Sequence, residues 1–172
     1  MGFSVVFLGG RQAGCIGLLT VCAASCEVLG VVAYDDRLRM LAEAMGLQHF
    51  GSIHEPSVQE LLSRSDLLVS VHGRERVPEE LLRLPRCGGI NAHPCLSWYK
   101  GMHPIERLLQ DGRARASVGV HRMTARLDEG TVLAEEFVDV SGSSTVEEVY
   151  NALYPFYAIA LLRALGAVRI PI

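Results

Sequence analysis

The sequence predicts an α/β fold with a mainly parallel sheet and helices on both of its faces. Short, fully apolar runs alternate with helical segments through the first half of the chain, as they do in successive βαβ units. The length of 172 residues is typical of one domain, so residues 1–172 are expected to form a single unit. Hydrophobic residues make up 49% of the chain, which excludes disorder over most of its length.

The first half of the chain supplies four expected strands and four expected helices. The strands are the apolar runs at residues 4–8, 28–33, 67–71 and 88–91. The helices are expected at residues 14–25, 37–45, 57–64 and 78–84. Gly46 fits a helix C-cap, and Pro56 and Pro78 fit the first turns of the helices that follow them.

The pattern changes after Asn91. A helix is expected at residues 105–110, and strand-like runs follow at 117–123 and 132–140, joined by a turn at 127–130. We expect these runs to form an antiparallel C-terminal part. The stretch 143–148, Ser-Ser-Thr-Val-Glu-Glu, is typical of a helix start. It opens a last helix from about residue 146 to 165 that stops at Gly166 and is kinked or divided at Pro155.

Composition narrows the class of protein. A net charge of −3 without basic clusters argues against a dedicated nucleic-acid binder. No apolar run reaches the ~18 residues of a membrane span, and no basic region precedes the first apolar run as it would in a secretory signal. Five cysteines without a Cys-x-x-Cys pair favour a reducing, cytoplasmic location, and no closed set of His and Cys predicts a metal site.

The densest group of chemically active residues follows the fourth expected strand. Asn91 and His93 lie two positions apart at the strand end, so both point to the same side. In open α/β sheets, binding sites lie at this carboxyl edge. An amide can donate to a developing oxyanion and an imidazole can move a proton, which is acyl-transfer chemistry. The alternative is a structural turn with a capped histidine before Pro94.

A second segment carries Asp128, in the loop between the two late strands. Asp128 lies just before Gly130, where a turn would project its carboxylate toward a cleft. A carboxylate in this place can orient an imidazole, an amine or a water molecule. The alternative is an ordinary turn residue.

The glycines after the first strand, Gly9, Gly10, Gly14 and Gly17, do not fit the dinucleotide-binding spacing, and no Walker lysine follows them. An anion could bind the backbone amides at the start of the next helix. The alternative is a tight strand-to-helix turn with no ligand.

Taken together, the two segments resemble the folate-dependent formyltransferases. The resemblance is strong from about residue 67 to 140. It rests on Asn91-Ala92-His93-Pro94-Cys95-Leu96, Lys100-Gly101, Asp111-Gly112, Gly119-Val120-His121 and Asp128-Glu129-Gly130, with Val77-Pro78-Glu79-Glu80-Leu81-Leu82 upstream. The chain departs from the family pattern after the His-Pro turn, where Leu96-Ser97-Trp98-Tyr99 replaces a Leu-Leu-Pro sequence.

The resemblance implies a Rossmann-like formyltransferase fold and a catalytic trio of Asn91, His93 and Asp128. The implied cofactor is N10-formyltetrahydrofolate, from which a substrate amine takes the formyl group. The pterin of the folate would lie between the loop at residues 74–77 and the loop at residues 124–128. The implied cofactor-binding residues are Arg74, Glu75, Arg76, Val77, Thr124 and Asp128.

Three branches of the resembled family differ in the acceptor amine. The methionyl-tRNA enzymes carry a second domain, which we do not expect here because the chain ends at Ile172, just after the last predicted helix. The glycinamide-ribonucleotide enzymes have a phosphate loop that the sequence after the first strand does not match. The third branch formylates amino groups on nucleotide-linked sugars, and its members have varied first loops and a turn like Tyr99-Lys100-Gly101-x-x-Pro104. We therefore expect an amino-sugar nucleotide as acceptor. The two other acceptors, and hydrolysis of the formyl folate by water, are the alternatives.

Three residues are candidates for binding that acceptor. Arg11 and Lys100 could contact its phosphates, and Trp98, the only tryptophan, could stack on its sugar or base. Solvated surface charge and edge packing are the alternative interpretations. A non-catalytic binding module on this fold stays open as a different class of function, and a homodimer is left open too.

Overall fold

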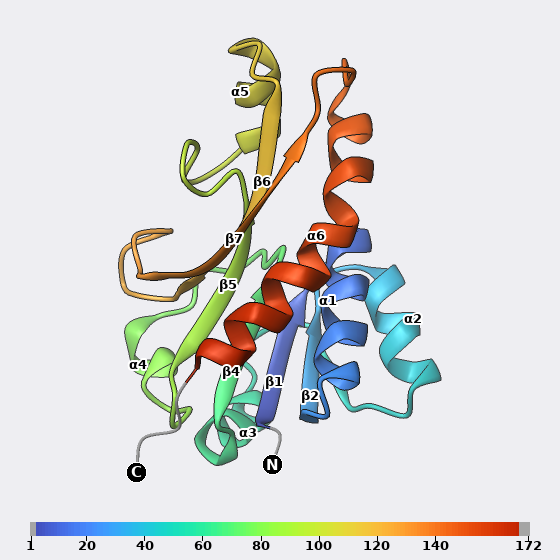
Figure 1. Cartoon of the computed structure of the whole chain (residues 1–172). Helices are drawn as coiled ribbons and strands as arrows, with labels where there is room; N and C mark the ends of the chain where they lie inside the picture. The colour runs from blue at the N-terminus through green and yellow to red at the C-terminus, as the bar shows by residue number, and fades with distance from the viewer. Residues whose placement is uncertain (1–2, 169–172) are drawn as a thin grey trace.

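Seven strands form one mixed sheet in the computed structural model, which describes residues 3–168 (Figure 1). The strand order is β3-β2-β1-β4-β5-β6-β7. The parallel strands are β1 (Ser4–Gly9), β2 (Glu27–Ala33), β3 (His49–Phe50), β4 (Leu67–Val71) and β5 (Gly89–Pro94). The antiparallel strands are β6 (Arg115–Arg122) and β7 (Val132–Asp139). The expected α/β class with an antiparallel C-terminal part is confirmed. Residues 1 and 2, which precede the first apolar run, lie outside the described range, as do residues 169–172.

Helices cover both faces of the sheet. One face carries α1 (Arg11–Ala23), α2 (Asp36–Ala44), α5 (Pro104–Gln110) and α6 (Val146–Ala167), which bury the larger apolar cluster. The other face carries α3 (Pro56–Arg64) and α4 (Glu79–Leu82), which bury the smaller cluster with β1 and β4. Strand residues alternate between the clusters: Val69 and Val71 face α1 and α6, whereas Leu68 faces α3 and α4.

Three of the differences between the structure and the expected elements concern the sheet and the carboxyl edge. β3 was not predicted, because two residues carry no periodicity. Helix α1 begins at Arg11 rather than at residue 14, directly after the Gly9–Gly10 turn. Strand β5 extends to Pro94, three residues beyond the predicted end, so His93 lies inside the strand rather than beyond it.

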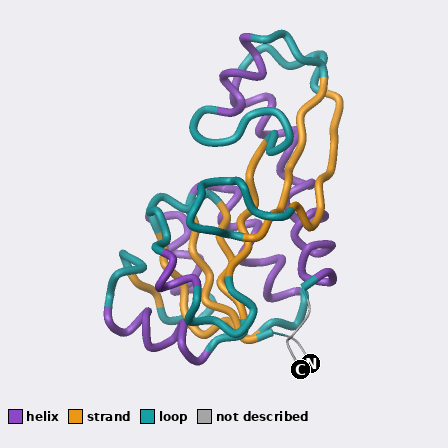
Figure 2. The backbone as a smooth tube through the Cα atoms, turned by 90° about the vertical axis from the view of Figure 1, so that its left-hand side faces the viewer, coloured by secondary structure: helices purple, strands orange, loops and turns teal. Residues whose placement is uncertain are grey.

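Pro155 does not divide the last helix. Helix α6 is continuous over 22 residues and changes direction partway along its length in Figure 1. Its start is fixed by a capping box, in which the Thr145 side chain accepts from the Glu148 amide and the Glu148 side chain accepts from the Thr145 amide. The β6–β7 ribbon and the loops near it extend beyond the parallel strands, as Figure 2 shows.

The carboxyl edge of the sheet collects residues with left-handed backbone. Arg11 follows β1 (φ 59°), His72 follows β4 (φ 55°) and Cys95 follows β5 (φ 55°), and none of them is glycine. Such conformations cost of order 1–3 kcal/mol each for most side chains and cluster at functional sites. The backbone at this edge is therefore shaped for placing side chains.

Candidate active site

Strand β5 positions Asn91 and His93 on the α3–α4 side of the carboxyl edge. Their neighbours Ile90 and Ala92 face the opposite cluster, so the two polar side chains share the other face. The structure brings Asp128 to the same place, because the loop after β6 passes back over β5. Gly130 lets this loop pass, since a Cβ there would lie 1.7 Å from the Arg122 carbonyl oxygen.

The ring of His93 is held on one side only. Its Nε2 lies 3.1 Å from Asp128 Oδ2 and 2.9 Å from the carbonyl oxygen of Gly101. Both oxygens accept, so Nε2 carries the hydrogen. The opposite nitrogen, Nδ1, is buried and finds no hydrogen-bond partner among the described residues. In the neutral ring Nδ1 therefore has a free lone pair.

Asp128 is buried, with 3% of its side chain exposed. Burial by itself raises the pKa of a carboxyl, but hydrogen bonding to His121, the charge of His93 and the amide of Gly101 outweigh burial and lower the pKa of Asp128. The Gly101 amide donates to Oδ2 over 2.8 Å. The carboxylate is thus ionised at neutral pH and orients the His93 ring from one side.

His121 completes the group and was not among the residues proposed from sequence. It faces Asn91 across the β5–β6 pair, and its Nε2 lies 3.3 Å from Asn91 Nδ2 and 3.3 Å from Asp128 Oδ1. Its Nδ1 lies 2.8 Å from the Arg122 carbonyl oxygen and so carries a hydrogen. A neutral His121 accepts from the Asn91 amide and a protonated one donates to Asp128, so the ring orients one or the other.

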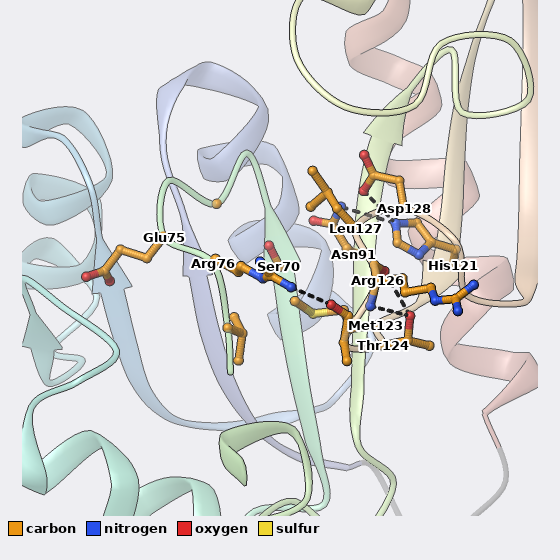
Figure 3. A pocket seen from close by; sticks show the side chains of 13 residues that line it. Ser70, Glu75, Arg76, Asn91, His121, Met123, Thr124, Arg126, Leu127 and Asp128 are labelled. Atoms are coloured by element: carbon orange, nitrogen blue, oxygen red, sulfur yellow. Dashed lines mark hydrogen bonds and ion pairs between the residues drawn. The ribbon is translucent and has the colours of Figure 1, made fainter. Parts of the chain in front are cut away.

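A cavity of about 90 Å³ lies beside these residues (Figure 3). Its walls are the two loops that the sequence proposed, together with residues of β4, β5 and β6. The lining residues are Ser70, Gly73, Glu75, Arg76, Val77, Asn91, His121, Met123, Thr124, Ala125, Arg126, Leu127 and Asp128. Of the proposed cofactor-binding residues, Arg74 is the one that is not in this wall.

The two loops are fixed by polar contacts. The Glu75 carboxylate points away from the other labelled side chains in Figure 3 and accepts hydrogen bonds from Tyr34, Ser52 and the Ile53 amide, at 2.6–2.9 Å. Arg76 Nη2 donates to the Ala125 carbonyl oxygen over 2.7 Å and so joins the loops. Glu75 therefore anchors the first loop to the protein, and Arg76 closes the gap to the second loop.

A second cavity of about 390 Å³ lies on the other side of this contact. It shares Arg76, Val77 and Ala125 with the first cavity and is otherwise lined by His54, Pro78 and Glu79. Over residues 3–168 we find no group of three His, Cys, Asp or Glu side chains arranged to bind a metal ion, and no helix long and apolar enough to cross a membrane.

The three proposed acceptor-binding residues are not gathered at the trio. Trp98 packs edge-on against Phe137 of β7, with ring centroids 5.5 Å apart, and the Arg113 guanidinium lies 5.1 Å from its ring. Lys100 is exposed, and its carbonyl oxygen accepts from Arg107.

Arg11 lies at the carboxyl edge, where its backbone amide donates to the Asp35 carboxylate. The glycine turn before it has a packing reason, since a Cβ on Gly9 would lie 2.5 Å from the Val71 carbonyl oxygen.

Sequence reasoning missed His121, His72 and the backbone of Gly101. His121 was quoted as part of a motif but given no role, although its strand position opposite Asn91 follows from pairing the two strands. Gly101 acts through its backbone, which no residue pattern reveals. His72 reaches its partners through a left-handed backbone conformation, and a histidine in the sequence does not indicate that conformation.

Comparison with known proteins places these residues in a family. The family described as "Formyl transferase" matches residues 39–165. Methionyl-tRNA formyltransferase from Natranaerobius thermophilus is 32% identical over 65% of this chain and 37% of its own length. That from Chromohalobacter salexigens is 28% identical over 95% of this chain and 55% of its own. The bifunctional polymyxin resistance protein ArnA from Wigglesworthia glossinidia brevipalpis is 24% identical over 87% and 25%, respectively.

The chain thus spans about half, or less, of the curated relatives it matches first. Among solved structures, phosphoribosylglycinamide formyltransferase from Anaplasma phagocytophilum superimposes with a TM-score of 0.81 at 19% identity, over 96% of this chain and 86% of that one. A formyltetrahydrofolate deformylase from Pseudomonas syringae pv. tomato gives 0.79 at 20% identity, over 96% and 60%. These structures share the fold, and the match over residues 39–165 shows that the chain belongs to the formyl transferase family.

Proposed function

We propose that the protein transfers a formyl group from N10-formyltetrahydrofolate to a primary amine. The observation that carries this proposal is the state of His93, whose Nε2 hydrogen is held by Asp128 and Gly101 while Nδ1 keeps a free lone pair. A ring fixed in this way keeps the lone pair that a general base needs, and the attacking amine would have to reach the buried Nδ1 to use it. Asn91, beside it in the same strand, supplies an amide donor for an oxyanion.

The proposed reaction proceeds in two steps. The amine nitrogen attacks the formyl carbon, the carbonyl electron pair moves to oxygen, and Asn91 Nδ2 donates to that oxygen. The attacking nitrogen gives its proton to His93 Nδ1, and Asp128 stabilises the imidazolium that forms. The intermediate then collapses, the bond from carbon to the folate nitrogen breaks, and His93 returns the proton to that nitrogen.

The folate would enter through the cavity beside the trio. At about 90 Å³ this cavity is smaller than the ~300 Å³ usual for a ligand pocket. The contact from Arg76 to Ala125 is a single hydrogen bond, which contributes about 0.5–1.5 kcal/mol. Its opening would join the neighbouring cavity and provide the missing space. Glu75 would keep its loop anchored while Arg76 moves.

The acceptor is a separate question, because the names of the relatives point to different amines. The names of the relatives include methionyl-tRNA and phosphoribosylglycinamide formyltransferases, which favours those acceptors over the amino-sugar nucleotide expected from the sequence. The net charge of −3 offers little attraction to tRNA. The proposal therefore specifies a primary amine. Methionyl-tRNA and glycinamide ribonucleotide are the acceptors that the names of the relatives favour, and the amino-sugar nucleotide is the acceptor that the sequence favours.

A transfer assay tests the proposal. The chain is incubated with N10-formyltetrahydrofolate and, in turn, a nucleotide-linked amino sugar, glycinamide ribonucleotide or charged initiator tRNA, at rising salt. We expect transfer to a small amine with a weak salt dependence, since few cations would meet its phosphates. Transfer to tRNA with a steep salt slope would replace the acceptor but keep the reaction. Release of formate without transfer to any amine would instead establish a hydrolase.

A further inference from the structure

Three aromatic side chains gather on the α6 side of the carboxyl edge, away from the folate cavity. We call His72, Tyr150 and Tyr154 the aromatic platform. The His72 and Tyr150 ring centroids are 5.5 Å apart, and those of Tyr150 and Tyr154 are 6.3 Å apart with planes tilted by 26°. All three residues are half-buried.

His72 reaches the platform because its backbone is left-handed. Ser70 and His72 lie two positions apart and would share one face of a regular strand. Ser70 lines the cavity on the α3–α4 side, whereas His72 packs against α6, where its Nε2 lies 2.9 Å from the hydroxyl of the buried Tyr157. The turn at φ 55° thus moves the imidazole to the opposite side of the sheet.

The platform lies next to the reacting centre. Val71 pairs with Ala92 in the β4–β5 register, and His72 and His93 are the residues that follow this pair in their chain segments. Burial, with the nearby charges of Arg11 and His93, lowers the pKa of His72 to about 4. The platform is therefore uncharged at neutral pH.

A neighbouring carboxylate makes this side a poor place for a phosphate. Asp35 accepts hydrogen bonds from the backbone amide of Arg11, the first residue of α1, and from that of Leu38. The first free amide of α1, where an anion would bind, already faces a negative charge. What this side offers instead is the half-buried side chains of two tyrosines and one neutral histidine.

We propose that the aromatic platform binds a ring of the acceptor, the ring that bears the reacting amine. This inference rests on the proposed formyl transfer and names the acceptor chemistry that it favours. The amine reaches His93 and Asn91 from the α6 side while the folate reaches them from the α3–α4 side. The ring stacks on Tyr150 and Tyr154, and His72 borders it nearest to His93.

Replacing Tyr150 and Tyr154 together by leucine tests this subsite. Stacking on an aromatic side chain typically supplies 1–3 kcal/mol, so we expect KM for a nucleotide-linked amino sugar to rise about tenfold or more. The KM for N10-formyltetrahydrofolate should stay within about twofold, because the cavity that would hold it is on the other face. The double phenylalanine variant keeps both rings, so the acceptor KM should rise less in it than in the double leucine variant.

The matched control is Phe156→Leu, which removes a ring from the same helix. Phe156 follows Tyr154 by two positions, so it lies on a different face of α6. It should leave both KM values unchanged. An unchanged acceptor KM in the double leucine variant, or transfer by the wild type only to amines on open chains, would overturn the subsite and leave formyl transfer standing. Absence of transfer to every amine would overturn both.

Discussion

The two sides of the catalytic edge are held by different forces. On the α3–α4 side, the cavity is walled by two loops, residues 73–77 and 123–128, that are joined by the hydrogen bond from Arg76 to Ala125. On the α6 side, the platform is built on a 22-residue helix whose inner face is packed in the main apolar cluster. A single hydrogen bond opens at small cost, but a packed helix does not move without exposing its core. We therefore expect the loops on the folate side to move when a ligand binds. The acceptor side should keep its shape and so discriminate between acceptors.

His93→Asn should have the largest effect, because His93 lies where the two sides meet. We expect kcat to fall about 100-fold or more, since a positioned acid-base group contributes about 10²–10⁴-fold. Both KM values should change little. Steady-state kinetics of formyl transfer, with thermal unfolding to show that the fold is intact, measure this. A variant that keeps near-wild-type turnover would remove His93 from the proposed reaction.

Asp128→Asn tests the carboxylate that contacts His93, and a similar loss of kcat is expected. The pKa of Asp128 is lowered in the folded protein, so its carboxylate stabilises the fold above the pKa of the unfolded chain, and this contribution is lost as the pH falls through the lowered value. The stability difference between wild type and variant should therefore shrink in acid. Urea unfolding between pH 7 and pH 3 measures it.

His72→Asn tests the acceptor side through the pH dependence of protein stability. The folded state holds the pKa of His72 at about 4, against 6.5 for a free imidazole, so the unfolded chain binds a proton first as the pH falls. Stability is thus lost from about pH 7 down to pH 4, by up to roughly 3 kcal/mol. Asparagine tolerates the left-handed backbone and does not titrate, so this part of the acid loss should disappear. A variant with the wild-type pH profile of unfolding would contradict the burial of a neutral ring.

Glu75→Ala should act on the folate side alone. It removes three hydrogen bonds that anchor the first loop, so we expect KM for the folate to rise about tenfold and the acceptor KM to stay unchanged. Glu75→Gln keeps one acceptor oxygen and should lie between. Equal changes in both KM values would show that the two sides are not independent.

Thr145→Ala should have the smallest effect. It breaks the capping box at the start of α6, and losing such a cap costs about 1 kcal/mol. Because Tyr150 lies about one and a half turns further along the helix, the acceptor KM should rise slightly, and by more than the folate KM. Chemical denaturation measures the loss of stability, and steady-state kinetics measure the two KM values.

Much of the fold was predictable, because buried strands and capped helices leave local signals. The runs at residues 67–71 and 132–140, for example, match β4 and β7 closely, since each is a continuous or alternating apolar segment. Strand β3 was missed because its two residues owe their pairing to β2 rather than to their own pattern.

The candidate site was predictable in part. Asn91 and His93 shared a face by strand spacing, and Asp128 joined them through the resemblance. Contacts made by backbone atoms, such as those of Gly101, and by residues distant in sequence, such as His72 with Tyr157, leave no local trace. Trp98 attracted attention as the only tryptophan, but in the structure its ring packs against Phe137.

The left-handed residues at the carboxyl edge also bear on engineering. Replacing such a residue by glycine or asparagine relieves backbone strain. At Arg11, His72 or Asp128 the same replacement would also remove the side chain that the strained backbone positions. Ser25 has the same conformation, with φ of 58°, but lies between α1 and β2 at the opposite end of the strands. A laboratory seeking a more robust version of this protein should therefore begin at Ser25 and leave the catalytic edge alone.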